Sequence, residues 1–238
     1  MTSLEAHNGH WDGPPSEVAA IRAELDGCLN ARDQQGRVIG NAKYGVYAFY
    51  DYDGEPIYVG QTTEMLRTRI RRHLTNQRTD AVAMSVLDPF EVAEIEMWPL
   101  FDLQTEPTET VAAILNSAEY TVYMLVLERS SFQAVLNEKD IAVTRTLPLP
   151  PSHRSRIVPD ALFQERRHPD IRIARRAATI ASLAKVISER SVSSGLRRTL
   201  VTQARRLERL SRQRLEELGE AYPVEAEGEE TGETSAEP

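Results

Sequence analysis

The clearest pattern in this chain is a change, within its first third, in the spacing of the apolar side chains. Residues 44–50 are rich in β-branched and aromatic side chains, and the same pattern resumes at residues 56–60 after Asp53-Gly54, a strong turn signal. The period then lengthens to about four, with Thr63 placed as an N-cap. The residues that carry this longer period are Leu66, Ile70 and Leu74. The pattern predicts an antiparallel hairpin followed by a helix.

The remaining elements follow from weaker patterns. Residues 90–100 alternate imperfectly between apolar and acidic side chains, which predicts a third strand half exposed to solvent. Residues 81–87 fit either a short helix or an extended segment, and the helix is favoured. Clearer helical periods cover residues 17–31, 108–127, a short stretch from Pro159, 169–191 and 194–218.

Composition divides the chain into four parts. Residues 1–16 and the acidic residues 219–238 are predicted to be disordered. Residues 17–147 are predicted to form a small α/β (α+β) domain, in which helices flank a three-stranded antiparallel sheet. The proline-rich connector at residues 147–151 leads into an α-helical extension, residues 148–218, which would bind DNA or form a dimer.

The charge is unevenly distributed along the chain. The 238 residues carry a formal net charge of −8, but the last twenty hold seven Glu and no Lys or Arg. Residues 151–218 hold sixteen Lys and Arg against seven Asp and Glu, a net charge of about +9. Such a region suits a nucleic-acid partner, and a solvated helical face is the alternative interpretation.

Composition also excludes some classes of protein. A content of 41% hydrophobic and 27% charged residues is ordinary for a soluble globular protein. The single cysteine, Cys28, excludes an intramolecular disulfide framework and a cysteine-rich zinc site. Residues 1–16 contain no apolar run, so they are neither a signal peptide nor a membrane segment. We therefore expect a cytosolic protein with no membrane partner.

Two triplets stand in the predicted hairpin, GVY at residues 45–47 and, after ten intervening residues, YVG at residues 58–60. They resemble the signature of the GIY-YIG nuclease superfamily. In this family an Arg and a His follow four residues apart on the next helix, and Arg69 and His73 match them. A later apolar helix carries a Glu and is followed by an Asn, which match Glu119 and Asn137. Gln61 departs from the family, many of whose members carry a Lys at this position.

The resemblance implies a metal-dependent endonuclease that hydrolyses phosphodiester bonds in DNA. Tyr47 would orient or deprotonate the attacking water, and Tyr58 would bind phosphate or complete the water network. Arg69 would stabilise the charge of the transition state, and His73 would relay a proton or bind phosphate. Glu119 would hold Mg²⁺ or Mn²⁺.

Each of these roles has a plainer alternative. Glu119 stands in an apolar run, where an unpaired buried carboxylate is costly, unless it faces solvent between its neighbours. Asn137 would brace the site, with Asn116 as a rival, although an Asn at a helix end is often only a cap. Other strand tyrosines, such as Tyr44 and Tyr50, are interpreted as packing residues.

DNA contacts outside the reacting centre are expected from one polar residue at the end of the hairpin and from arginines on the two basic helices. These are Gln61, Arg67, Arg71, Arg72, Arg197, Arg198 and Arg205. For Arg67 and Arg72 the alternative is a solvated helical face. A series of leucines on the last helix predicts either a homodimer contact or burial against residues 171–187 of the same chain, with Arg206 on the outer face. The leucines are Leu196, Leu200, Leu207 and Leu210.

The size of the chain favours a restriction or phage-defence nuclease among the classes that the resemblance allows. No helix-hairpin-helix or zinc module for repair is recognisable in the sequence. A structure-specific nuclease of DNA repair or recombination is one alternative. A DNA-binding or scaffold module with the same fold but no cleavage activity is another.

Overall fold

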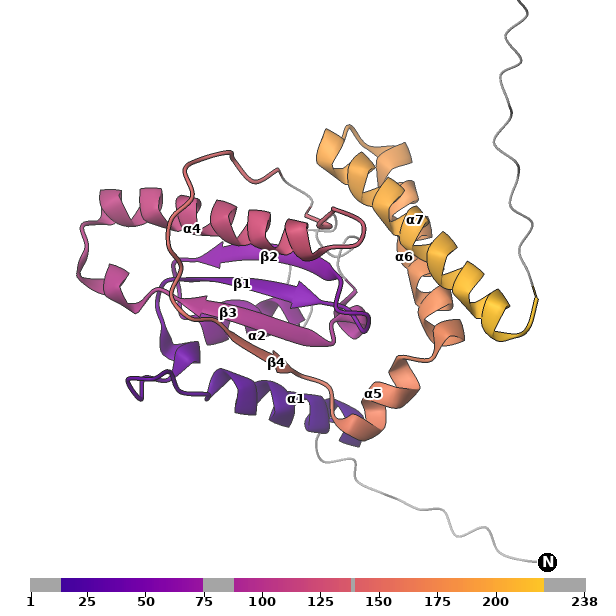
Figure 1. The fold of residues 1–238 in the computed structure, drawn as a ribbon, viewed down its shortest axis with the longest axis horizontal. Helices are drawn as coiled ribbons and strands as arrows, with labels where there is room; N and C mark the ends of the chain where they lie inside the picture. The colour runs from indigo at the N-terminus through magenta and orange to yellow at the C-terminus, as the bar shows by residue number, and fades with distance from the viewer. Residues whose placement is uncertain (1–13, 75–87, 138–139, 221–238) are drawn as a thin grey trace, which may run out of the picture.

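The computed structural model describes residues 14–74, 88–137 and 140–220. These residues form an α+β fold with six α-helices and an antiparallel four-stranded sheet of order β2-β1-β3-β4 (Figure 1). The strands are β1 (Gly45–Tyr50), β2 (Pro56–Thr62), β3 (Glu94–Pro99) and β4 (His153–Arg156). The helices are α1 (Ser16–Leu29), α2 (Leu66–Leu74), α4 (Thr108–Arg129), α5 (Asp160–Arg166), α6 (Pro169–Glu189) and α7 (Ser194–Glu217). The helix predicted at residues 81–87 lies outside the described residues, as do most of the two ends predicted to be disordered.

β1 and β2 form the predicted hairpin. Gly54 in its turn has a φ of 76°, a conformation that glycine adopts without steric cost. Asp51 closes the turn, because its carboxylate accepts hydrogen bonds from the backbone N–H groups of Asp53 and Glu55 at 2.9 and 3.0 Å. The turn signal in the sequence is therefore confirmed by the structure.

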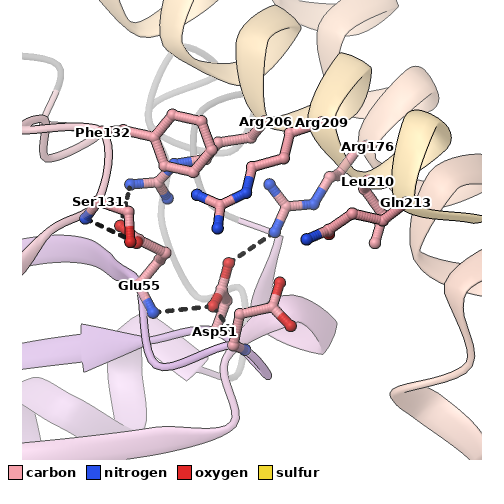
Figure 2. Close-up of a pocket in the computed structure, with 10 residues that line it drawn as sticks. Asp51, Glu55, Ser131, Phe132, Arg176, Arg206, Arg209, Leu210 and Gln213 are labelled. Carbon is pink, nitrogen blue, oxygen red and sulfur yellow. Dashed lines mark hydrogen bonds and ion pairs between the residues drawn. The ribbon is translucent and has the colours of Figure 1, made fainter. Parts of the chain in front are cut away.

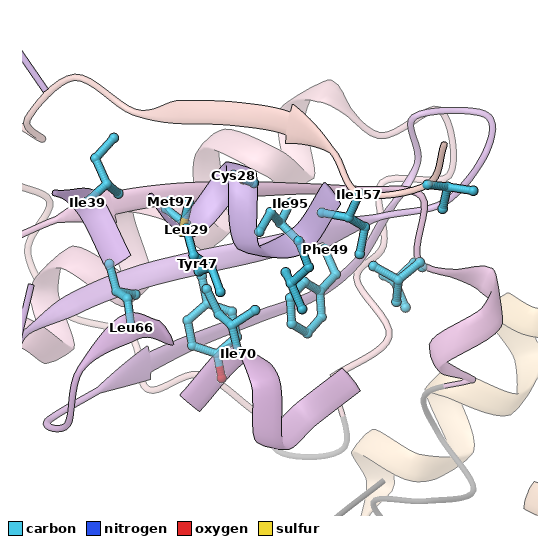
Figure 3. Close-up of a cluster of buried hydrophobic side chains, with 14 of the residues drawn as sticks. Cys28, Leu29, Ile39, Tyr47, Phe49, Leu66, Ile70, Ile95, Met97 and Ile157 are labelled. Carbon is cyan, nitrogen blue, oxygen red and sulfur yellow. The ribbon is translucent and has the colours of Figure 1, made fainter. Parts of the chain in front are cut away.

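Helices cover both faces of the sheet (Figure 1). Successive strand residues point to opposite faces, so the side chains of the sheet contribute to two separate hydrophobic cores. Figure 3 shows the core against α1 and α2, which includes Leu29, Tyr47, Phe49, Leu66, Ile70, Ile95 and Met97. The core against α4 includes Val46, Ala48, Tyr50, Val59, Trp98, Leu115, Ala118, Val122 and Val126.

β3 is buried, so the prediction of a half-exposed strand is wrong. Its Glu96 is 4% exposed and accepts hydrogen bonds from the hydroxyls of Tyr50 and Ser152 at 2.6 and 2.7 Å. Because α4 covers this face, the acidic residue marks a paired carboxylate under a helix rather than a solvated surface.

The sheet has a fourth strand where the sequence predicts three. β4 pairs antiparallel with β3 and covers its otherwise open edge. Its sequence, HRSR, shows no hydrophobic alternation, because its contribution is backbone pairing rather than apolar burial. Ile157 and Val158 follow it into the core, each 2% exposed. The extension predicted to be helical therefore begins with a strand of the sheet.

α2 begins at Leu66, so the prediction of Thr63 as its N-cap is wrong. The chain first makes a turn in which the Glu64 N–H donates to the Thr62 hydroxyl at 3.1 Å. Thr62, the last residue of β2, thus accepts a backbone hydrogen bond beside the predicted cap, and the helix starts at Leu66.

α6 and α7 pack against each other through only part of the two apolar stripes that the sequence suggests. Leu183 and Leu196 form only a small apolar cluster between them. Three arginines are buried instead, Arg172, Arg176 and Arg206, with exposed fractions of 1%, 5% and 3%. The prediction that Arg206 lies on the outer face is therefore wrong, because its guanidinium packs against the start of β2, where it bonds to the Pro56 carbonyl oxygen and lies 3.6 Å from Glu55.

The leucines of α7 serve the chain itself. Leu196 and Leu210 are 3% and 8% exposed in a single chain. A stripe that is already covered offers little apolar area to a second subunit, so the structure does not support a homodimer through it.

Among the described helices, α4 alone is long and apolar enough to span a membrane. It lies on the sheet, however, with Val111, Leu115 and Val122 buried against the strands. Its apolar character is that of a core helix of the α+β domain.

Candidate active site

The hairpin places Tyr47 and Tyr58 on the face that packs against α2. Tyr47 pairs with Gly60 across the two strands, and the two tyrosine rings lie with their centroids 6.1 Å apart. A Cβ atom at Gly60 would stand 2.6 Å from the Tyr58 ring and 2.9 Å from the Tyr47 hydroxyl. Only glycine at this position lets both tyrosines keep their places.

The other glycine of the two triplets sets the distance between β1 and α2. A Cβ atom at Gly45 would lie 3.0 Å from both the Leu66 side chain and the Trp98 carbonyl oxygen. Its absence lets the first turn of α2 pack closely against the strand. This close packing brings the polar face of α2 to the tyrosines.

Arg69 and His73 lie one helical turn apart on that face. Arg69 Nε donates a hydrogen bond to the Tyr47 hydroxyl oxygen at 3.3 Å, and His73 Nε2 lies 3.1 Å from the same oxygen. The His73 ring is 2% exposed and meets the Tyr47 ring edge-on. The Tyr47 oxygen is thus held between a guanidinium and an imidazole.

The electrostatics of this cluster favour a charged Arg69. Burial alone lowers the pKa of Arg69, but the hydroxyls of Tyr47 and Tyr58 outweigh it and raise that pKa on balance. A fixed positive charge beside a phenol favours the phenolate form of that phenol. Arg69 therefore supplies a positive charge next to the buried Tyr47 oxygen.

Glu119 reaches the site from α4. Burial raises the pKa of its carboxyl to about 7, although hydrogen bonds from Gln61 and the charge of Arg69 act in the opposite direction. Gln61 also donates from Nε2 to Asn116 Oδ1 at 2.7 Å. Gln61 therefore links β2 to α4 beside Glu119, and Asn116 shares this role. The sequence did not indicate it for either residue.

The residues present fit a metal site with a single protein ligand. Glu119 is a hard carboxylate oxygen ligand whose burial disfavours its charge, and a bound divalent cation would restore that charge. The described residues contain no group of three or more His, Cys, Asp and Glu that would suit a closed metal cage. One carboxylate with open coordination positions is the arrangement that Mg²⁺ uses at phosphate substrates.

Asn137 contacts the outer edge of β2 rather than the tyrosines. Its amide Nδ2 donates to the Val59 carbonyl oxygen at 2.8 Å, and its Oδ1 accepts from the Val59 N–H at 3.0 Å. Val59 follows Tyr58 directly, so Asn137 braces the backbone that carries this tyrosine. The rival, Asn116, instead contacts Gln61.

A groove of about 350 Å³ opens beside Arg69, between α4 and the turn that leads into α2. Its lining includes Gln61, Glu64, Arg69, Ala112 and Asn116. Guanidinium and amide groups on its walls can donate hydrogen bonds to phosphate oxygens. Of the predicted catalytic side chains, Arg69 lies in this lining, so a sugar-phosphate segment in the groove would reach Arg69 first.

The arginines predicted to bind DNA are less closely associated with this site. Those on α2 each have a partner on the same chain: Arg67 with Asn30, Arg71 with Asp26 and Arg72 with Glu64. Arg197, Arg198 and Arg205 are exposed on α7, where Arg198 pairs with Asp140. The structure thus brings together Tyr47, Tyr58, Arg69 and His73, with Glu119 near Arg69, but it places neither Asn137 nor the α7 arginines among them.

Tyr47, Tyr58, Arg69 and His73 thus lie together on one face of the sheet, and Arg69 also lines the groove. Residues 43–108 match the family model of the GIY-YIG catalytic domain, which confirms the resemblance. This segment contains Tyr47, Tyr58, Arg69 and His73, whereas Glu119 and Asn137 follow it. The match supports nuclease action on DNA in general. Comparisons with curated proteins and with solved structures find no match.

Proposed function

We propose that this protein is a metal-dependent DNA endonuclease of the restriction or phage-defence type. The observation that carries the proposal is the contact of Arg69 and His73 with one oxygen, the Tyr47 hydroxyl, within a matched nuclease domain. A phosphodiester hydrolase needs a proton acceptor for water and positive charge on the phosphate, and these three residues offer both.

Tyr47 acts as the proton acceptor in the proposed reaction. As the water oxygen attacks phosphorus, its proton passes to the Tyr47 oxygen while the Tyr47 proton passes to His73 Nε2, 3.1 Å away. The bond from phosphorus to the leaving sugar oxygen breaks, and that oxygen takes a proton from solvent. Arg69 stabilises the phenolate and the charge that develops on the phosphate oxygens. Tyr58, whose ring lies beside Tyr47 and His73, orients the water or the phosphate.

Glu119 holds Mg²⁺ or Mn²⁺ in this proposal. When bound, the ion supplies Lewis-acid charge to a phosphate oxygen. Gln61 orients the Glu119 carboxylate through the hydrogen bonds described above, and Asn116 in turn fixes the Gln61 amide. The groove beside Arg69 admits the DNA backbone.

The proposal of a restriction or phage-defence enzyme, rather than a repair enzyme, rests on the domains that the chain contains. The described residues contain no candidate zinc module of the kind that equips many repair enzymes. We propose a cytosolic enzyme that cuts unbranched duplex DNA. A repair or recombination enzyme would instead prefer branched substrates.

Incubation of the purified protein with supercoiled plasmid, single-stranded DNA and branched DNA tests the proposal, in Mg²⁺, in Mn²⁺ and in chelator. We expect cleavage of plasmid that depends on the metal. Tyr47→Phe should lower the rate by about 10²-fold or more, as for a general base, whereas Tyr44→Phe removes a tyrosine hydroxyl outside the site and should not. Absence of cleavage under all these conditions overturns the proposal, and DNA binding without cleavage identifies a non-cleaving module.

A further inference from the structure

Arg206 of α7 is buried against two backbone segments of the nuclease domain. Its Nη2 donates to the carbonyl oxygens of Pro56 and Ala134, each at 3.1 Å. Pro56 is the first residue of β2, and Ala134 belongs to the loop that follows α4. A single guanidinium from the C-terminal hairpin thus joins these two segments.

The loop that Arg206 holds runs along the open edge of β2. β2 is the outermost strand, so one side of its backbone has no neighbouring strand. The Leu136 N–H donates to the Ile57 carbonyl oxygen at 3.0 Å, and the Asn137 amide pairs with both polar groups of Val59. Leu136 and Asn137 therefore bond to the residues just before and just after Tyr58, along the edge where a fifth strand would otherwise pair.

α7 contacts this loop at a second point. The Thr199 hydroxyl donates to the Asn137 carbonyl oxygen at 3.3 Å, and Thr199 is 2% exposed. Thr199 and Arg206 lie two helical turns apart on the same face of α7. The helix therefore holds both ends of the segment from Ala134 to Asn137.

Carboxylates of the β1–β2 turn keep Arg206 in its buried position. Glu55 lies 3.6 Å from Arg206 Nη2 and accepts hydrogen bonds from the Ser130 hydroxyl and the Ser131 N–H at 2.7 and 2.8 Å. Asp51 pairs with Arg176 of α6 at 2.6 Å in the same cluster (Figure 2). A buried arginine that is hydrogen-bonded and paired gives a geometrically specific contact.

We propose that Arg206, assisted by Thr199, is a positioning residue for the active site. It fixes the loop and the start of β2 so that Tyr58 keeps its place beside Tyr47 and His73. α6 and α7 are then a part of the catalytic domain and not only an appended DNA-binding hairpin. The activity part of this inference rests on the proposed nuclease function.

Amide hydrogen exchange and steady-state cleavage test the proposal in the full-length chain. The Val59 N–H donates to Asn137 Oδ1, so its exchange reports directly on the brace. Arg206→Met should accelerate Val59 exchange while β3 amides stay protected. It should lower kcat by about 10-fold to 100-fold and leave KM within about twofold, because the reacting groups are misplaced while DNA contacts persist.

Three further variants separate positioning from general stability. Arg206→Lys keeps a donor near the two carbonyls and should recover part of kcat. Thr199→Val keeps the volume of the side chain but loses its hydrogen bond, and it should accelerate Val59 exchange and lower kcat by about fivefold. Arg212→Met, an exposed arginine on the same helix that pairs with Glu208, should change neither quantity.

The results divide clearly. Unchanged Val59 exchange in Arg206→Met, or loss of protection spread equally over β3, overturns the inference, as does an unchanged Thr199→Val. A wild-type protein that cuts no DNA overturns the proposed function alone. In that case Val59 exchange in Arg206→Met and Thr199→Val still decides whether α7 positions β2.

Discussion

At the residue scale, the candidate site depends on small groups with fixed neighbours. Gly60 is needed because any Cβ would overlap two tyrosines, and Tyr47 is useful because its oxygen contacts both Arg69 and His73. Arg69 contributes charge and Glu119 contributes a buried carboxylate. Neither side chain belongs to the hydrophobic core, so their loss should affect chemistry more than folding.

Arg69→Ala and Glu119→Ala should therefore bind DNA and fold normally but cleave very slowly. Removing a group that stabilises transition-state charge costs about 10²-fold to 10³-fold in rate. Single-turnover cleavage and a binding titration, with a melting curve for each variant, measure these effects. Arg145→Ala, at an exposed arginine in the loop before β4, is the matched control and should behave as wild type. Either site variant cutting at the wild-type rate would remove that residue from the mechanism.

At the element scale, buried ion pairs dock α6 onto the domain. Arg172 pairs with Asp53 at 2.7 Å, and both Arg172 and Arg176 lie 3.7 Å from Glu91. Burial raises the pKa of Glu91 to about 7, even though the two arginines act to lower it, and Asp51 adds to the rise. This docking contact should consequently respond to pH.

The sign of the Glu91 effect follows from its raised pKa. Between the unfolded value near 4.5 and the folded value of about 7, the folded protein keeps a proton that the unfolded chain releases. The free energy of unfolding should thus fall as pH rises through this window, by about 3 kcal/mol. Glu91→Gln lacks this contribution.

Urea unfolding of wild type and Glu91→Gln from pH 5 to pH 8 tests this expectation. The difference in unfolding free energy should grow in favour of the variant as pH rises, because only the wild type acquires a buried charge. Glu109→Gln, in the exposed first turn of α4, serves as the control. Parallel pH profiles for Glu91→Gln and wild type would contradict a role for Glu91.

β4 gives a second expectation at this scale. A chain ending at Pro151 loses β4 and the helices α5 to α7, together with Ile157 and Val158, whose burial is worth about 1.5 to 3 kcal/mol each. It also exposes the edge of β3, which favours aggregation. We expect it to unfold at much lower temperature than a chain ending at Glu220, as measured by circular dichroism. Equal midpoints would show that β4 is dispensable.

At the scale of the whole molecule, charge divides the chain into opposing regions. The basic residues 151–218 should attract DNA, and the Glu-rich residues 219–238 should compete with DNA for them. Affinity should fall by about 0.9 log units per log unit of salt for each phosphate neutralised.

Deletion of residues 219–238 should tighten DNA binding, most at low salt, because a competing anionic segment is removed. Fluorescence anisotropy with a labelled duplex, from 50 to 300 mM salt (roughly the range over which such electrostatics are screened), measures the change. Replacing the seven Glu by Gln at constant length is the control for charge. An affinity that stays the same at every salt concentration would rule out this role for the acidic residues.

The sequence by itself determined the β1–β2 hairpin and α2, on which the resemblance to the GIY-YIG family pointed to Tyr47, Arg69 and His73. These features arise within one local unit, where turn chemistry and helical period fix the neighbours of each side chain. The long period of α4 likewise placed Glu119 on a helix. The start of α2 was displaced by two residues, from Glu64 to Leu66, because a hydroxyl at the end of β2 competes for the backbone there.

Only the tertiary structure decided the fourth strand and the burial of Arg206. β4 is held by backbone pairing with β3, and such pairing leaves no period in a polar sequence. Arg206 is buried because Glu55 and two carbonyl oxygens, all more than 70 residues away along the chain, compensate it. Hydrogen bonds and ion pairs between distant segments depend on how the chain closes in space, so a local reading of an arginine-rich helix assigns its residues to solvent.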